Sequence, residues 1–139
     1  MKQTDDLRLE LMESSDLDRF LSRNEESFEA ESCGAMLQSA FENLDISKAE
    51  LARRSGMSTV YLYQVFSGRR RPSRDRMICL CIGMGCSLDA TQELLKRNGF
   101  SVLYPRNRRD AIIIYSLCRG IGLQETNDKL YQEREETLS

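Results

Sequence analysis

Histidine is absent from the 139 residues of this chain, and proline occurs only twice. The absence of histidine removes the commonest general base and the commonest partner of a catalytic serine or cysteine. The chain also contains no GxSxG motif, no P-loop and no glycine-rich dinucleotide turn. We therefore expect a protein that is not an enzyme and that binds no cofactor.

Cysteine occurs five times, but neither as a CxxC pair nor as an even set, so it gives no disulfide framework. Cys79 and Cys81 fall two residues apart in an expected helix, where they point about 200° away from each other. They are poorly placed to share a metal ion, and we expect no metal site. We interpret the cysteines as small buried hydrophobes of a protein in a reducing compartment.

Long apolar segments are missing as well. The longest candidate, residues 77–86, contains two glycines and is shorter than the roughly 18 residues that span a membrane. The N-terminus has no basic region followed by an apolar stretch, so the sequence predicts no signal peptide. We expect a cytoplasmic protein without membrane contact, of a length that fits one domain.

Charge is present in both signs, but it is unevenly distributed. Residues 1–32 carry ten acidic and four basic side chains, a net charge of −6, whereas residues 47–76 carry two acidic and eight basic ones, a net charge of +6. Residues 101–139 balance six against six. A basic patch is the electrostatic footprint of a protein that contacts phosphate backbones, although solvated surfaces also carry such runs.

Helical signals dominate the pattern, because apolar residues recur at spacings of three and four. In the segment "SKAE", Ser47 can cap a helix and Glu50 can bond back to it. The sequence predicts an all-α fold, with helices over residues 4–13, from about residue 15, and over residues 33–44. Further helices are expected between each serine cap and the next glycine stop, at residues 47–56, 58–68, 73–85 and 87–99. Residues 25–31 either extend the second helix or form a linker.

Two short helices joined by a turn of about three residues, with helices before and after, form a helix-turn-helix layout. Residues 46–98, "ISKAELARRSGMSTVYLYQVFSGRRRPSRDRMICLCIGMGCSLDATQELLKRN", resemble the lambda-repressor/Cro-like helix-turn-helix domain, also called the XRE family. With the helix from residue 33, the resemblance implies a five-helix repressor-like core over residues 33–99. It is carried by Leu51-Ala52, Gly56, Ser58, the Gly68 stop, the basic run around Pro72 and the turn from Gly85 to Leu88.

The resemblance implies a DNA-binding site on the helix that follows Ser58. In this family the second motif helix enters the major groove, and the flanking residues hold phosphates. Among the expected base contacts, Gln64 suits adenine and Val60 suits a thymine methyl. The expected base contacts are Thr59, Val60, Tyr63 and Gln64. The expected phosphate contacts are Lys48, Arg69, Arg70, Arg71, Ser73 and Arg74.

The same helix leaves alternatives open. At 100° per residue its expected base contacts share one face, while Leu62 and Val65 lie on the other. The reading face has no arginine, lysine or asparagine, and Phe66 adds a further apolar group. Such a face can contact a protein instead of DNA, or it can simply be packed. The arginine run can be an ordinary solvated loop, and Arg74 can pair with Asp75 or with other acidic residues.

An internal repeat connects the middle of the chain with its end. Residues 73–95 align with residues 108–130 at an offset of 35, so that Arg74-Asp75 matches Arg109-Asp110. The repeat predicts a second helical hairpin within residues 100–139, preceded by a turn at Tyr104-Pro105. This C-terminal hairpin either enlarges the core or serves as a dimer interface or a partner-binding surface.

The acidic residues 1–32 are expected to form a helical arm with three alternative roles. The arm is a solvated cap, docks on a partner protein, or folds over the basic patch and competes with DNA, since opposite charges attract within about 8–10 Å. We predict a transcriptional regulator that binds double-stranded DNA as a homodimer, because one recognition helix reads few base pairs. The alternative is a protein-interaction adaptor or an antitoxin-like partner built on the same fold.

Overall fold

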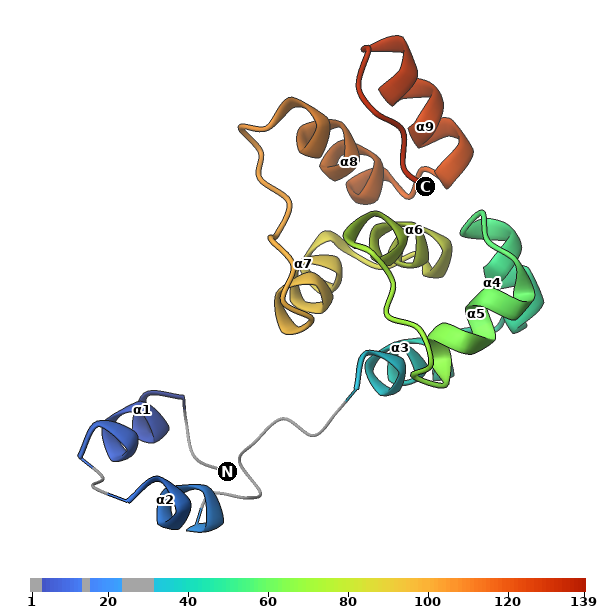
Figure 1. Ribbon diagram of the computed structural model, residues 1–139. Helices are drawn as coiled ribbons and strands as arrows, with labels where there is room; N and C mark the ends of the chain where they lie inside the picture. Colours follow the sequence, from blue (N-terminus) through green and yellow to red (C-terminus); the bar gives the residue numbers. More distant parts are fainter. Residues whose placement is uncertain (1–3, 14–15, 24–31) are drawn as a thin grey trace. The chain divides into compact units, whose positions relative to one another are not determined.

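The computed structural model describes residues 4–13, 16–23 and 32–139, and all the regular structure in these residues is α-helical (Figure 1). The fold class is therefore the one that the sequence predicts. Contacts divide the chain into two compact units, residues 1–31 and residues 32–139. None of the described helices is long and apolar enough to cross a membrane.

The first unit contains α1 (Thr4–Glu13) and α2 (Leu17–Arg23), which contact each other. Both helices are short, and the side chain of Phe20 on α2 is buried. The expected extension or linker over residues 25–31 lies outside the described residues. Among the described residues of this unit, the large apolar side chains that stay exposed are Leu9, Leu11, Met12 and Leu17.

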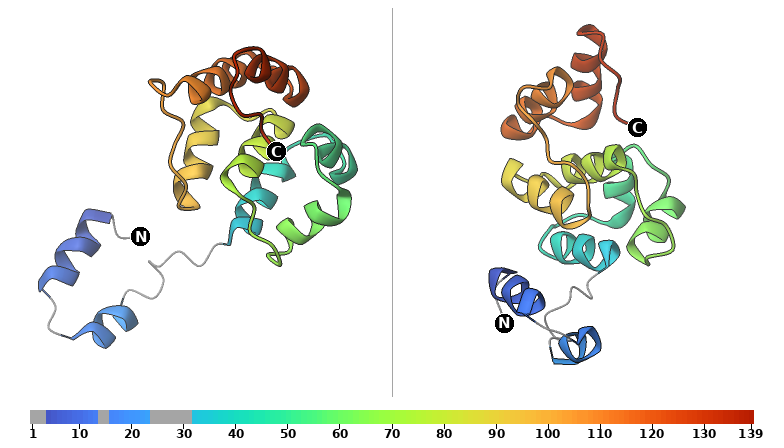
Figure 2. Two further views of the ribbon diagram at one scale, coloured as in Figure 1. Left: turned by 45° about the horizontal axis from the view of Figure 1, so that its top comes forward. Right: turned by 60° about the vertical axis from the view of Figure 1, so that its left-hand side comes forward.

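The second unit consists of seven helices. The α6–α7 pair lies between α3 on one side and the α8–α9 pair on the other (Figure 2). The repeat thus corresponds to two helical hairpins that lie next to each other, α6–α7 and α8–α9. The helices are α3 (Cys33–Glu42), α4 (Lys48–Arg54), α5 (Thr59–Phe66), α6 (Arg74–Met84), α7 (Leu88–Arg97), α8 (Arg108–Arg119) and α9 (Leu123–Gln132).

Serine caps determine where the first five of these helices begin. In each case the serine hydroxyl accepts a hydrogen bond from the backbone N–H three residues later, at 3.1 or 3.2 Å, which satisfies a donor that the helix leaves unpaired. At the other end, Gly85 and Gly120 adopt left-handed conformations that end α6 and α8. The capping serines are Ser32, Ser47, Ser58, Ser73 and Ser87.

The capping box at the start of α4 is formed only on one side. Ser47 accepts from the Glu50 N–H as expected, but the Glu50 carboxylate accepts hydrogen bonds from the side chains of Arg53 and Arg54. These bonds, from Arg53 foremost, lower the pKa of Glu50 to about 2. The carboxylate therefore neutralises part of the basic patch instead of completing the cap.

Helix α6 forms the centre of the core. It is buried from Met77 to Met84, and it contacts α4, α7 and α9. Burial raises the pKa of the Cys79 thiol to about 11, and a hydrogen bond with Cys86 together with burial raises that of Cys81. These two cysteines are buried hydrophobes as we expected, whereas Cys118 is exposed and the remaining two are half-buried.

The offset of 35 holds in three dimensions beyond the residues that align in sequence. Helices α7 and α9 begin and end 35 positions apart. Gln92 forms two hydrogen bonds with the backbone N–H and C=O of Leu103, and Asn127 does the same with Leu138. Both leucines are buried, so each hairpin is closed by the same amide-to-backbone contact.

Two reciprocal ion pairs join the hairpins. Arg74 at the start of α6 donates to the Asp110 carboxylate of α8, at 3.1 and 3.5 Å, and Arg109 of α8 donates to the Asp75 carboxylate of α6, at 2.9 and 3.1 Å. Each guanidinium also bonds two carbonyls of its own hairpin's last segment. These acceptors again lie 35 apart, at Ser101 and Val102 for Arg74 and at Glu136 and Thr137 for Arg109.

Arg109→Ala is expected to lower the free energy of unfolding by about 2–3 kcal/mol, because it leaves the part-buried Asp75 without its cation. Urea denaturation followed by circular dichroism measures the change. The matched control is Arg106→Ala in the preceding loop, which removes an exposed arginine and should cost less than about 0.5 kcal/mol. Equal stabilities of the two variants would show that the ion pairs do not hold the hairpins together.

Candidate nucleic-acid interface

Helices α4 and α5 are joined by a tight turn. Gly56 has a φ of 67°, and the Met57 N–H bonds the Ala52 carbonyl at 3.0 Å. Leu51 and Ala52 of α4 are buried in the same core as Leu62 of α5. The turn and the shared core fix the two helices against each other, in the order that a helix-turn-helix requires.

The opposite face of α5 is open to solvent. Val60 is 68% exposed and Tyr63 is 53% exposed, whereas Leu62 and Val65 are fully buried. Thr59 is exposed as well, and Gln64 is half-buried. The structure therefore brings all four residues of the expected base-reading set together on one accessible face.

Phe66 does not belong to that face. Its ring lies edge-on against Phe41 of α3, with centroids 5.7 Å apart, so it packs α5 onto α3. The ammonium group of Lys48 lies 5.0 Å from the Phe66 ring and 5.2 Å from the Tyr63 ring. These cation–π contacts hold Lys48 beside the exposed face of α5.

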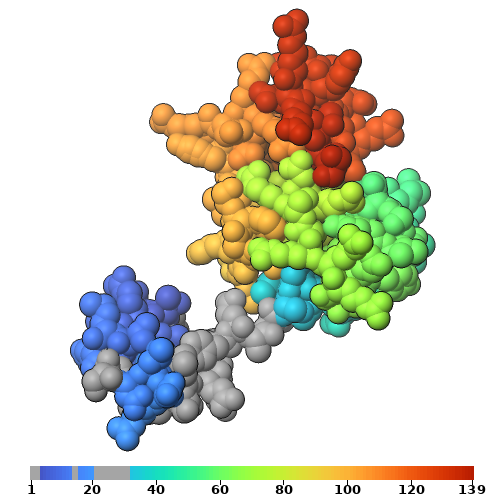
Figure 3. All heavy atoms as spheres, in the orientation of Figure 1, coloured from blue at the N-terminus to red at the C-terminus, as the bar shows by residue number. Residues whose placement is uncertain are grey.

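The arginines after α5 fall into two groups. Arg69 and Arg70 are exposed, and their backbone N–H groups bond the Gln64 carbonyl at 2.9 and 3.2 Å. Arg71 instead donates to the Asn98 carbonyl and lies over the Phe100 ring, 5.1 Å from its centroid. Arg74 is engaged with Asp110, which is the pairing alternative that the sequence left open. Figure 3 shows the continuous surface that runs from α5 to the start of α6, in light green.

Ser73 lies where this surface reaches α6. Its hydroxyl caps the helix by accepting from the Arg76 N–H at 3.2 Å, and its side chain is exposed. The guanidinium of Arg76 lies 4.5 Å from the Tyr61 ring. Sequence reasoning missed this contact, because nothing local in the sequence signals a stacking partner 15 residues away. Arg76 thus contacts α5 through Tyr61, which is not one of the expected base-contacting residues.

The net charge of +6 over residues 47–76 therefore overstates the free positive charge. Arg53 and Arg54 share the Glu50 carboxylate, and Arg74 pairs with the Asp110 carboxylate of the C-terminal hairpin. Within the described residues, the cations of this segment that have neither a carboxylate nor a carbonyl partner are Lys48, Arg69, Arg70 and Arg76. The first three flank the exposed face of α5.

The arrangement defines a helix-turn-helix domain, with α4 and α5 as the motif. Residues 37–90, from α3 to the start of α7, match the helix-turn-helix family. This segment is a lambda-repressor/Cro-like domain and belongs to a DNA-binding, non-enzymatic domain class. Helices α1, α2, α8 and α9 lie outside the matched segment. Comparisons with curated proteins and with solved structures found no match.

Gly34→Ala is expected to destabilise the protein by about 1–3 kcal/mol, because the added methyl would overlap the Phe66 carbonyl oxygen and push α5 away from α3. The sign of the change in stability is diagnostic, because a Gly→Ala substitution in an exposed helix stabilises a protein by up to about 1 kcal/mol. Thermal unfolding measures it, with Ser39→Ala on the exposed side of α3 as the control. A stabilising effect of Gly34→Ala would show that α3 and α5 do not approach so closely.

Proposed function

We propose that this chain is a sequence-specific DNA-binding transcriptional regulator that inserts α5 into the major groove. The observation that supports the proposal is the exposed face of α5, with Lys48 beside its Tyr63 ring and the exposed Arg69 and Arg70 directly after its C-terminal end. Exposed side chains next to free cations match the way in which helix-turn-helix domains dock on the duplex, with base contacts from one helix and phosphate contacts from the residues around it.

Each residue of the face has a chemical role in this proposal. Gln64 forms a bidentate hydrogen bond with an adenine edge, and Val60 packs on a thymine methyl. Thr59 and Tyr63 reach base edges or sugars beside them. Lys48, Arg69, Arg70 and the exposed first turn of α6 at Ser73 contact phosphates.

Arg71 and Arg74 are different, because their guanidinium groups already have partners in the protein. A phosphate contact by Arg71 requires it to leave the Asn98 carbonyl and the Phe100 ring. Arg74 would have to leave Asp110 and two carbonyls. We therefore assign Arg71 and Arg74 to the scaffold that holds the loop between α5 and α6.

A homodimer is part of the proposal. A single helix contacts only a few base pairs, and two copies on neighbouring half-sites multiply the discrimination between sequences. The half-sites would then be separated by about one helical turn of DNA and would be related by a two-fold axis.

A second candidate function is a protein-interaction module built on the same fold. It is favoured by the same face, because Val60 and Tyr63 are large, exposed and apolar or aromatic, and no arginine or asparagine lies between them. Binding to a protein through this face would depend on Tyr63 and only weakly on salt, whereas DNA binding depends strongly on salt.

Arg70→Ala and Gln64→Ala are expected to weaken DNA binding in different ways. Loss of Arg70 removes a phosphate contact, so affinity falls on all sequences and the slope of log K against log salt decreases by about 0.9. Loss of Gln64 relaxes the preference at one base pair by about 1–3 kcal/mol. Fluorescence anisotropy on a duplex selected from a random library, and on its scrambled version, measures both effects.

Arg106→Ala is the control for this experiment, since it removes an exposed arginine of the loop before α8. It should leave both affinity and salt slope unchanged. If no duplex is enriched from the library, or if Arg70→Ala and Arg106→Ala behave alike, the regulator proposal is wrong. A salt-insensitive partner that is lost with Tyr63→Ala would then support the interaction module.

A further inference from the structure

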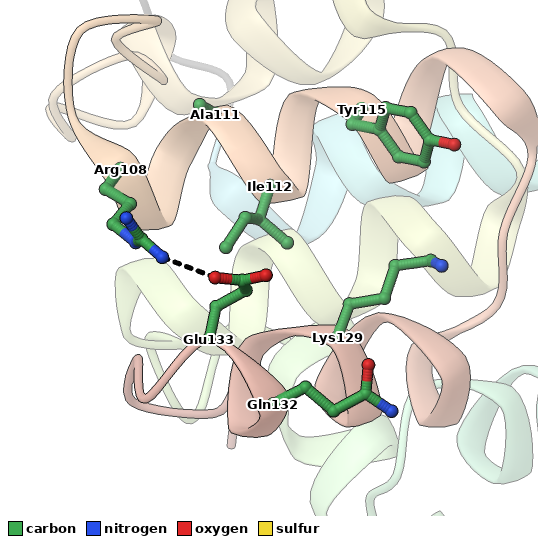
Figure 4. A pocket seen from close by; sticks show the side chains of 7 residues that line it. All are labelled: Arg108, Ala111, Ile112, Tyr115, Lys129, Gln132 and Glu133. Atoms are coloured by element: carbon green, nitrogen blue, oxygen red, sulfur yellow. Dashed lines mark hydrogen bonds and ion pairs between the residues drawn. The ribbon is translucent and has the colours of Figure 1, made fainter.

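The outer side of the α8–α9 hairpin contains a groove of about 470 Å³ (Figure 4). Ile112 lies in its centre, between Arg108 at one end and Tyr115 at the other, and Lys129 extends from α9 toward the Tyr115 end. Tyr115 is 45% exposed and Ile112 is only half-buried. The groove is lined by Arg108, Ala111, Ile112, Tyr115, Lys129, Gln132 and Glu133.

The internal repeat shows how such a face is covered. Subtracting 35 from Ile112, Tyr115 and Lys129 gives Met77, Leu80 and Leu94 of the α6–α7 hairpin. All three of these residues are buried. The same face is therefore closed in the first hairpin and open in the second.

Helices α3 and α5 contact α6–α7 next to that face. Asn98, the counterpart of Glu133, donates a hydrogen bond from its side chain to the Met36 sulfur of α3, at 3.4 Å. The guanidinium of Arg76, the counterpart of Ala111, lies over the Tyr61 ring of α5. Within residues 32–139 no helix occupies the corresponding position on α8–α9, whose outer side forms the end of the unit (Figure 2).

The two ends of the groove differ in charge. At the Arg108 end, one guanidinium pairs with the carboxylates of Glu133 and Glu135. At the Tyr115 end, the Arg119 guanidinium stacks 3.7 Å from the ring centroid and the Lys129 ammonium lies 5.8 Å from it. Neither of these two cations has a carboxylate partner among the described residues. A bound molecule with a carboxylate at the Tyr115 end would provide an ion-pair partner for both cations.

We propose that this groove binds an acidic amphipathic helix of a partner protein, which lies on α8–α9 as α3 lies on α6–α7. Its apolar side packs on Ile112 and Tyr115, in the helix-in-groove mode that uses contacts at i, i+3 or i+4, and i+7. One or two carboxylates at its edge pair with Lys129 and Arg119. The proposal does not rest on DNA binding by α5, because the two faces share no residue.

The test uses two synthetic 16-residue helical peptides with the same leucine stripe. One peptide carries glutamates on both edges of the stripe and the other carries lysines. The full-length protein should bind the glutamate peptide about tenfold more tightly than the lysine peptide, as measured by fluorescence anisotropy. In NMR spectra, the shifted amide signals should be those of residues 108–119 and 129–133.

The charge reversal Lys129→Glu with Arg119→Glu should invert the preference in favour of the lysine peptide. Both side chains lie at the surface of the hairpin, and circular dichroism checks that the variant remains folded. The matched control, Lys96→Glu with Arg106→Glu, reverses two exposed cations elsewhere and should leave the preference unchanged.

Three results would overturn the proposal. The first is that neither peptide binds, or that both bind equally. The second is that the shifted signals lie on α5 instead of α8 and α9. The third is that the protein self-associates in sedimentation runs and that Ile112→Glu abolishes the association, which would show that a second copy occupies the groove.

Discussion

The exchange of ion pairs between Arg74-Asp75 and Arg109-Asp110 is the interaction on which the rest of the second unit depends. Each guanidinium closes its own hairpin through two backbone carbonyls and also binds the carboxylate of the other hairpin. The pairs are reciprocal, which is the property of a two-fold interface between equivalent surfaces. Here both surfaces belong to one chain. Because α6 also contacts α4, these ion pairs connect the C-terminal hairpin with the helix-turn-helix motif.

The helices were predictable from the sequence, whereas the partners of the arginines were not. Serine caps and left-handed glycines act within three or four residues, so Ser47, Ser58 and Gly85 can be recognised without any tertiary information. The partner of Arg74 lies 36 residues away, and a count of charges treats every cation as free. Of the candidate interface, the exposed face of α5 could be predicted from the sequence, because helical periodicity separates Val60 and Tyr63 from the buried Leu62. The repeated Arg-Asp pair in the sequence was a signal for the reciprocal ion pairs. It predicts them only if the two hairpins are known to meet where α6 and α8 begin.

The two hairpins differ in residue type at one left-handed position. Gly99 has a φ of 78°, and a side chain there would come near the Arg71 guanidinium that reaches Asn98. Its counterpart Arg134 also has a left-handed φ of 59°, although this conformation costs a residue with a side chain about 1–2 kcal/mol. The two copies thus share this backbone conformation, although only the first has glycine there. Arg134 is exposed. The first copy is restrained by packing against the helix-turn-helix motif, and the second copy is free on the corresponding side.

This difference explains how one chain can carry two distinct faces. The α3 helix lies beside the first hairpin, where its Met36 sulfur accepts a hydrogen bond from Asn98, and its Gly34 allows the close approach to the Phe66 carbonyl that holds α5 in place. Lys48 is ordered on two aromatic rings beside that helix, so less side-chain entropy is lost when it binds an anion. The packing that closes the first hairpin therefore also organises the face of α5 in advance. The second hairpin supports the core from the other side through its ion pairs, and its outer surface is left for a different contact.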